Sequence, residues 1–135
     1  MAIFWSVILA SIVNMVIGYY WYSEKFFGKK WRQYAELSDE KLSQLEKKDV
    51  RRSYVINFIA SFIMVYMLAF FLLATEAVTV FQALGTAFWL WLGFIATTHI
   101  GSVLFEKKSK GYFFINTLYY LIVLFVDSFI LIGNI

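Results

Sequence analysis

Four long runs of apolar residues divide the chain, and shorter polar stretches separate them. The runs cover about residues 2–22, 54–74, 78–105 and 112–133. Each is long enough for a membrane span, because a helix needs about 20 mostly apolar residues to cross about 30 Å of hydrocarbon. The runs lack the alternation and short spacing of transmembrane barrel strands. The pattern therefore predicts an all-α membrane protein in which residues 1–135 form one domain, with four transmembrane helices in an antiparallel up-down bundle.

The longest polar stretch, residues 23–53, joins the first two runs and is predicted to hold a short helix in its second half. Ser38 suits an N-cap, and Leu42 and Leu45 lie one turn apart in a narrow apolar stripe. This helix either lies on the lipid headgroups or extends the second span. Extension is slightly favoured because no helix breaker precedes Tyr54. The mixed charges are typical of a solvated face, and docking of a cytoplasmic partner at residues 23–53 is the weaker alternative.

The first half of the same loop combines aromatic and basic residues. Phe27 and Trp31 stand among Lys25, Lys29 and Lys30, directly after the first span. This combination at the end of a span is typical of an interfacial anchor. A site for lipid headgroups is the alternative, and the anchor is favoured.

The composition agrees with a membrane protein and excludes several other classes. Hydrophobic residues make up 61% of the chain, charged residues 16%, and the mean hydropathy is +0.70. Soluble domains are closer to half apolar and a quarter charged, so a soluble globular enzyme and a disordered chain are excluded. The chain has no Cys, which excludes disulfide frameworks, thiolate metal sites and cysteine nucleophiles.

The basic residues predict how the spans are oriented. Of the 12 Lys and Arg residues, nine lie in residues 23–53 and three at Lys107, Lys108 and Lys110. Because positively charged loops stay in the cytoplasm, we expect a multi-pass protein of the plasma (inner) membrane with both termini outside the cytoplasm. No basic residue precedes the first span, which we therefore interpret as an uncleaved helix. The net charge of +3 reflects this topology, and no nucleic acid partner is expected.

Small and polar residues form a stripe on two of the predicted spans. Small residues at helix interfaces let two backbones approach closely, and these stripes are predicted to be packing surfaces. Because both cannot face the inside of a four-helix bundle, one is available to a second subunit, and we expect a homo-oligomer. The first span contributes Ser6, Ala10, Asn14 and Gly18, and the third contributes Gln82, Thr86, Trp89, Gly93, Thr97 and Gly101.

Each span also carries a strongly polar residue in the half nearer the basic loops. At a rise of about 1.5 Å per residue, these four residues fall at similar depths. They are predicted to form one polar layer that binds a ligand: Asn14, Asn57, His99 and Asn116. Asp127 falls in the opposite half, at the depth of Gln82 and Thr86, and is predicted to accept a hydrogen bond from one of them.

Simpler explanations compete with a binding role for each of these residues. The asparagines are more often hydrogen-bonding links between helices, and a lone His99 is more often a packing residue than a metal ligand. Asp127 is the exception, because a carboxyl within a span is costly and no Lys or Arg lies in its half of the membrane. His99 and Asp127 are predicted at different depths, and no catalytic or phosphate-binding motif occurs. We therefore expect no enzyme, no cofactor and no metal.

One segment carries a recognisable motif, N-x3-G-x2-W-Y-S-x3-F-G-x2-W, from Asn14 to Trp31. With Trp91 to Phe94, Phe105-Glu106, Phe114 to Asn116 and Tyr119, it resembles a bacterial family of small four-helix membrane proteins known only as a domain of unknown function. The resemblance implies the fold and brings no activity, substrate or cofactor. It marks a set of positions for mutation: Asn14, Gly18, Trp21, Tyr22, Gly28, Trp31, Glu106 and Asn116.

Two functions remain open from the sequence. The first is a small transporter or pore that moves a small polar solute or ion, its identity unknown, through the polar layer. The second is a scaffold that binds lipid or a partner through the segment from Trp21 to Trp31. A cavity around the polar layer favours the transporter, and dry pairing between helices favours the scaffold.

Overall fold

The structure is a computed structural model that describes residues 2–35 and 47–134. The helices are α1 (Ala2–Trp21), α2 (Gly28–Tyr34), α4 (Lys47–Ala74), α5 (Val80–Leu90), α6 (Thr97–Leu104) and α7 (Lys110–Ile132), with a π-helix η1 (Trp91–Ala96) between α5 and α6. Four helical stretches are long and apolar enough to cross a membrane: Ala2–Trp21, Asp49–Ala74, Val80–Leu104 and Lys110–Ile132. The predicted all-helical fold with four spans is confirmed.

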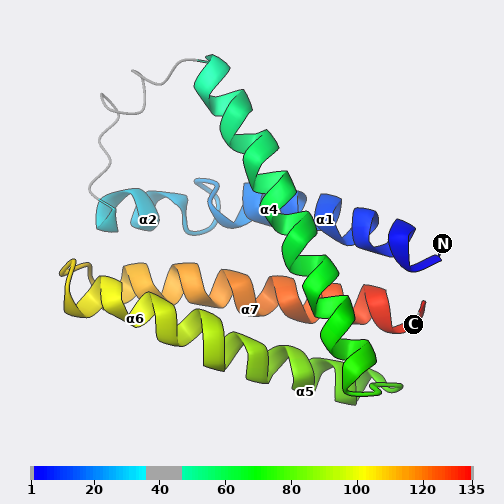
Figure 1. The fold of residues 1–135 in the computed structure, drawn as a ribbon. Helices are drawn as coiled ribbons and strands as arrows, with labels where there is room; N and C mark the ends of the chain where they lie inside the picture. The colour runs from blue at the N-terminus through cyan, green and yellow to red at the C-terminus, as the bar shows by residue number, and fades with distance from the viewer. Residues whose placement is uncertain (1, 36–46, 135) are drawn as a thin grey trace.

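Helix α7 occupies the centre of the bundle. It contacts α1, α2 and α4 as well as the α5–η1–α6 span. Figure 1 shows α1, α7 and the α5–η1–α6 span running roughly side by side, while α4 crosses them obliquely. The N- and C-termini lie at one end, and α2 and the end of α6 lie at the other. We call these the terminal end and the α2 end.

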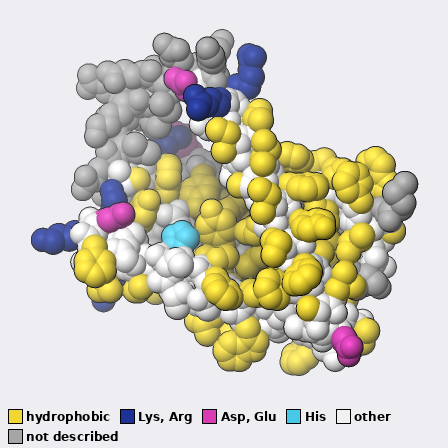
Figure 2. Space-filling model, viewed as in Figure 1, with side chains coloured by type: hydrophobic (Ala, Val, Ile, Leu, Met, Phe, Trp, Pro, Cys, Tyr) yellow, Lys and Arg dark blue, Asp and Glu magenta, His cyan; other side chains and the backbone are white. Residues whose placement is uncertain are grey.

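The interior of the bundle is small, and its outer surface is strongly apolar. Buried side chains such as Ala10, Leu68, Ala87 and Leu124 fill the contacts between the helices. Large apolar residues, Phe81 among them, are exposed around the outside. Figure 2 shows apolar side chains over most of the visible face, with Lys and Arg near the start of α4 and at the end of the bundle where α6 ends. An exposed apolar belt with charges at the ends suits a protein surrounded by lipid.

Helix α4 is longer than its apolar run. It starts at Lys47, whereas hydropathy alone predicts a span from Tyr54. The charged turn before Tyr54 therefore extends the second span, as the absence of a helix breaker suggests. Most of the helix predicted in the second half of residues 23–53, including Ser38, Leu42 and Leu45, lies outside the described residues. The first half of the loop, predicted only as an anchor, forms the short helix α2.

The third span changes its winding near its middle. A Thr79–Gln82 capping box begins α5, and residues Trp91–Ala96 then adopt π-helical hydrogen bonding. The Trp91 indole N–H donates to the carbonyl of Thr117 at 2.6 Å and ties this segment to α7. Because a π-turn holds more residues than an α-turn, the side chains beyond it are rotated about the helix axis. The stripe predicted from Gln82 to Gly101 at regular α-helical spacing is therefore interrupted.

A tight turn places α2 against the bundle, and Gly28 makes this turn feasible. The Gly28 N–H donates to the Ser23 carbonyl at 2.8 Å, and the residue is buried. A Cβ atom at position 28 would overlap the backbone of Tyr22 and Ser23. At the other end of α2, the Tyr34 ring lies where a Cβ atom on Gly111 would be. Backbone and ring contacts therefore hold α2 on the start of α7.

We expect Gly28→Ala to destabilise the protein by about 1–3 kcal/mol, the usual cost of forcing extra atoms into a packed site. Gly85→Ala is the matched control, because no atom lies within 4 Å of the added methyl group. Thermal unfolding followed by tryptophan fluorescence in lipid nanodiscs measures both variants. Equal melting temperatures for the two variants would contradict this role of Gly28.

Candidate functional site

A buried asparagine links three helices in the middle of the bundle. The Asn14 side-chain amide on α1 donates one hydrogen bond to Ser61 Oγ on α4, at 2.9 Å. It donates a second to Asp127 Oδ2 on α7, at 3.0 Å. Asn14 and Asp127 are 1% and 0% exposed, so this cluster is shielded from lipid. We call Asn14, Ser61 and Asp127 the polar cluster.

The pairing of Asp127 differs from the sequence prediction. Asp127 contacts Asn14, not Gln82 or Thr86. In a helix, each Cα–Cβ bond tilts toward the N-terminus. Because α1 and α7 are antiparallel, the two side chains lean toward each other, and groups about one turn apart in depth can meet. Depth counted along the backbone omits this lean and placed them in opposite halves.

Gln82 and Thr86 serve the local structure of the third span instead. The Gln82 side-chain oxygen accepts hydrogen bonds from the backbone N–H groups of Val78 and Thr79. The Thr86 hydroxyl donates to the Gln82 carbonyl at 3.1 Å and lies 3.4 Å from the Thr75 hydroxyl. Both residues therefore stabilise the turn at the terminal end.

The polar cluster has unused hydrogen-bonding capacity. Asn14 Oδ1 and Asp127 Oδ1 are buried and have no hydrogen-bond partner. The hydroxyl of Ser128, next to Asp127, is also buried and unpaired. Leaving such groups unpaired inside a protein is costly. Both unpaired oxygens of Asn14 and Asp127 are shielded, and of these two residues only Asn14 also lines a cavity.

A cleft between α1, α4 and α7 leads to this cluster. Its inner chamber, of about 180 Å³, is lined by Asn14 and Ser61 of the cluster. Its outer chamber, of about 530 Å³, shares four lining residues with the inner one and continues toward α2. The shared residues are Met15, Asn57, Tyr119 and Tyr120. The two chambers therefore lie on either side of the same four side chains, and we call them together the cleft.

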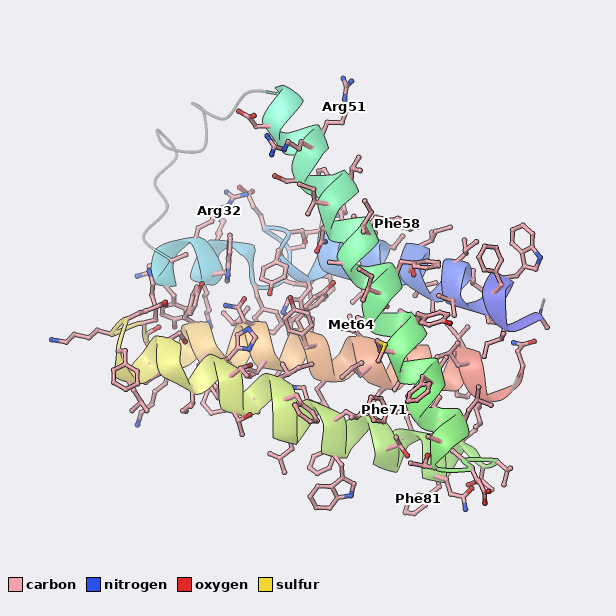
Figure 3. All side chains as sticks on the ribbon, in the orientation of Figure 1. Arg32, Arg51, Phe58, Met64, Phe71 and Phe81 are labelled. Atoms are coloured by element: carbon pink, nitrogen blue, oxygen red, sulfur yellow. The ribbon has the colours of Figure 1, made fainter. Side chains whose placement is uncertain are left out.

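The oblique course of α4 opens the cleft. From Ser61 onward, α4 buries a residue on nearly every turn, but between residues 49 and 60 nearly all of its side chains are exposed. Figure 3 shows Met64 where α4 crosses the line of α7, with Phe58 closer to the α4 N-terminus. Asn57, on the diverging part of α4, makes only a 3.5 Å contact to Met15 Sδ. Its amide therefore borders the cleft and makes no strong contact with another helix.

Tyrosines and one ion pair surround the outer chamber. Arg32 on α2 bonds to Glu24 at 3.2 Å, and both line this chamber. Tyr19, Tyr22 and Tyr54 line it as well, together with the shared Tyr119 and Tyr120. Of the residues that line the outer chamber, the sequence marked Asn57 as a ligand candidate, and Gly18 and Tyr22 through the motif. Tyr19 and Tyr54 were not predicted, because tyrosines near span ends usually mark the membrane interface. Tyr119 and Tyr120 lie near the middle of α7, and no sequence signal places them at a chamber.

The other members of the predicted polar layer lie elsewhere. Asn116 Oδ1 accepts a hydrogen bond from the Tyr22 hydroxyl at 2.7 Å. His99 Nδ1 lies 2.9 Å from the Ile95 carbonyl of its own helix. His99 and Asn116 line a separate side pocket, so the four residues form no single layer.

The residues of the sequence motif pack inside the protein. The Trp21 indole donates to the Ile115 carbonyl at 3.0 Å, and the Trp31 and Tyr22 rings lie 5.1 Å apart. Phe27 stacks on Trp21 at 4.6 Å. These aromatic rings fix α1, α2 and α7 to one another, a more internal role than the predicted anchor. Glu106 is exposed beside the side pocket.

The two predicted small-residue stripes differ in burial. Ser6, Ala10 and Asn14 are buried within the bundle. Gly18 packs against Tyr119, and a Cβ atom added at position 18 would lie 2.9 Å from the Tyr119 hydroxyl. The same hydroxyl donates a hydrogen bond to the Asn14 carbonyl. Gly93 and Thr97 on the third span are exposed, and Gly101 is half-buried. The first stripe therefore packs inside, and the second stays on the outer surface.

Across residues 2–35 and 47–134, no three His, Cys, Asp or Glu side chains gather as a metal site requires. The family described as "Protein of unknown function (DUF1761)" matches residues 5–132. The chain therefore belongs to this family, and the resemblance found in the sequence is confirmed. No curated protein and no solved structure gives a significant match.

If Asn14 links α1 to α7 through Asp127, the two residues should be energetically coupled. We expect Asn14→Ala and Asp127→Ala each to lower stability, and the double variant to lose less than their sum. The coupling should be about 0.6–1.7 kcal/mol, the range found for hydrogen bonds between membrane helices. Asn57→Ala paired with Asp127→Ala is the control, since Asn57 makes its side-chain contact with Met15. Additive losses for Asn14 and Asp127 in unfolding titrations would contradict the link.

Proposed function

We propose that this member of the DUF1761 family is a small membrane transporter that admits a small polar or charged solute through the cleft. The observation that carries the proposal is that the inner of two neighbouring chambers reaches the polar cluster. The two chambers share four lining residues, and Asn14 and Ser61 form part of the wall of the inner one. In this role the Asp127 carboxyl accepts a hydrogen bond from Asn14 and holds its amide in place, and no catalytic step takes place.

The cost of the polar cluster supports this proposal. Carboxyl and amide groups within a membrane are expensive and usually face a partner or a water-filled cavity. Here two acceptor oxygens remain unpaired, although simple helix packing would be served by apolar residues. A site that exchanges a solute needs unpaired groups of this kind when it is empty.

We also propose an orientation for the cleft. The chain carries its Lys and Arg residues between the first and second spans and between the third and fourth. Those in the described residues lie in or next to α2, at the start of α4 and around the turn from α6 to α7. Under the positive-inside rule, the cleft then opens to the cytoplasm and both termini lie outside it, in the plasma membrane. The polar cluster would be the deepest point that a cytoplasmic solute reaches.

A second copy of the chain is the partner that we propose for the third span. Gly93 and Thr97 are exposed, and no atom lies within 4 Å of a Cβ atom built on Gly93. Small exposed residues let a neighbouring helix approach closely in lipid. A homo-oligomer formed this way would keep the cleft free, because the cleft is lined by α1, α2, α4 and α7.

Binding of lipid or of a cytoplasmic partner is the second candidate. Phe26, Lys29 and Lys30 are exposed on and beside α2, where they can meet anionic headgroups. None of these three residues lines the cleft, so substitutions here should affect lipid or partner binding without affecting transport.

Cysteine labelling tests the water access that transport requires. The chain has no Cys, so single variants report one site each. We expect a charged, water-soluble thiol reagent to label Asn57→Cys in the cleft much faster than Ile63→Cys, which is exposed on the same helix but lines no chamber. In inside-out vesicles labelling should be rapid, and in right-side-out vesicles it should be slow.

Flux into proteoliposomes completes this test. We expect at least one of a radiolabelled amine, sugar and carboxylate to enter faster than into protein-free liposomes. Asp127→Asn should slow that flux about tenfold, which corresponds to about 1.4 kcal/mol. Asp49→Asn, in the first turn of α4 and away from both chambers, should leave the flux unchanged. Equally slow labelling of both cysteines, or flux unaffected by Asp127→Asn, would contradict the proposal.

A further inference from the structure

The chemistry of the cleft also indicates what kind of solute it accepts. We propose that the solute is an organic ammonium ion, a protonated amine that carries an apolar or aromatic group. The inference rests on the proposed function, and it names the class of substrate. Three independent features of the cleft support it: the free acceptors at its end, the rings along its wall and the balance of charge.

The end of the cleft is rich in acceptors. An asparagine side chain has two N–H donors, and Asn14 already uses its amide nitrogen to bond Ser61 and Asp127. What remains unpaired is Asn14 Oδ1 and Asp127 Oδ1, both buried, so an ammonium group would reach them by displacing the side chains that cover them. Amide and carboxyl oxygens of this kind match the N–H groups of an ammonium ion. They offer nothing to a carboxylate or a phosphate, which would need donors.

The wall of the cleft is aromatic. Five tyrosines line the outer chamber, and Tyr119 and Tyr120 continue into the inner one. Aromatic rings attract cations through their negative faces, and clusters of such rings are a common means of binding organic ammonium groups. They also contact apolar substituents. A tyrosine-lined path therefore favours a cation with a hydrocarbon part over a strongly hydrated metal ion or a sugar.

The charges along the cleft do not oppose a cation. Among the described residues that line the two chambers, Arg32 is the only basic one, and its guanidinium is paired with Glu24 at 3.2 Å. Glu24 lies at the mouth, and Asp127 lies behind the inner end. A cation therefore passes one neutralised arginine and moves toward a carboxyl group. An anion would move toward that carboxyl group with no basic side chain to receive it.

Three ligands of nearly the same shape separate charge from size. 2-Phenylethylamine is a cation at neutral pH, 2-phenylethanol is its neutral counterpart, and phenylacetate is an anion. We expect the full-length protein in nanodiscs to bind the amine, measured by calorimetry and by tryptophan fluorescence. The alcohol and the carboxylate should bind at least about tenfold more weakly, as a cation–π contact of about 1–2 kcal/mol implies.

Variants of the wall assign this binding to the cleft. Tyr54 is exposed in the outer chamber, so its replacement should leave the fold intact. Tyr54→Phe keeps the ring and should retain amine binding, whereas Tyr54→Leu should weaken it several-fold. Tyr66→Leu is the matched control on the same helix, because Tyr66 is exposed but lines neither chamber. Asp127→Asn should weaken binding further, and the Tyr54 pair stays informative if that variant fails to fold.

The outcomes distinguish the two levels of the proposal. Equal binding of amine and alcohol, or equal effects of Tyr54→Leu and Tyr66→Leu, would overturn the assignment of an ammonium ion. If Asn57→Cys is labelled and another solute crosses the bilayer in that case, the transport function stands with a different substrate class. If no solute crosses and Asn57→Cys is unreactive, the transport function itself fails.

Discussion

The hydrogen bonds of Asn14 are the interaction on which the rest of the structure depends. Hydrocarbon offers no partner to an amide or a carboxyl group, so Asn14, Ser61 and Asp127 must meet inside the bundle. Their meeting fixes the rotation of α1, α4 and α7 about their own axes. It also marks the point at which α4 joins the bundle, because its first buried residue is Ser61. Before that point α4 diverges, and the space it leaves is the cleft.

Close packing around the Asn14 hydrogen bonds fixes the positions of the helices that line the cleft. Gly18 brings α1 close enough to α7 for the Tyr119 hydroxyl to reach the Asn14 carbonyl. Trp21 and Tyr22, about one helical turn after Gly18, donate hydrogen bonds to Ile115 and Asn116 of α7. The turn at Gly28 then brings α2 back against the bundle. The same residues that close the bundle on one side therefore line the cleft on the other. Substitutions in this segment should alter stability and solute binding together.

The sequence predicted the spans well and the site only in part, for a physical reason. Span length and hydropathy follow from the thickness of the bilayer, so α1 and α7 begin and end within two residues of expectation. The neighbours of a polar residue depend on helix rotation and side-chain lean, which hydropathy does not contain. Asp127 was therefore predicted to bond Gln82 or Thr86, whereas it bonds Asn14. His99 and Asn116 were grouped with Asn14 and Asn57, whereas they line a separate pocket. The π-turn at Trp91–Ala96 has no proline to reveal it.

The most direct test of the account measures the Asn14–Asp127 contact at the end of the cleft. Solid-state NMR on protein in lipid bilayers, with ¹⁵N in asparagine side chains and ¹³C in aspartate carboxyls, detects such a pair by its dipolar coupling. We expect one dipolar-coupled pair between an asparagine side-chain nitrogen and an aspartate carboxyl carbon, and we expect Asn14→Ala to remove it. A spectrum without that coupling, or one in which the coupling persists in Asn14→Ala, would contradict the central role of the Asn14–Asp127 contact.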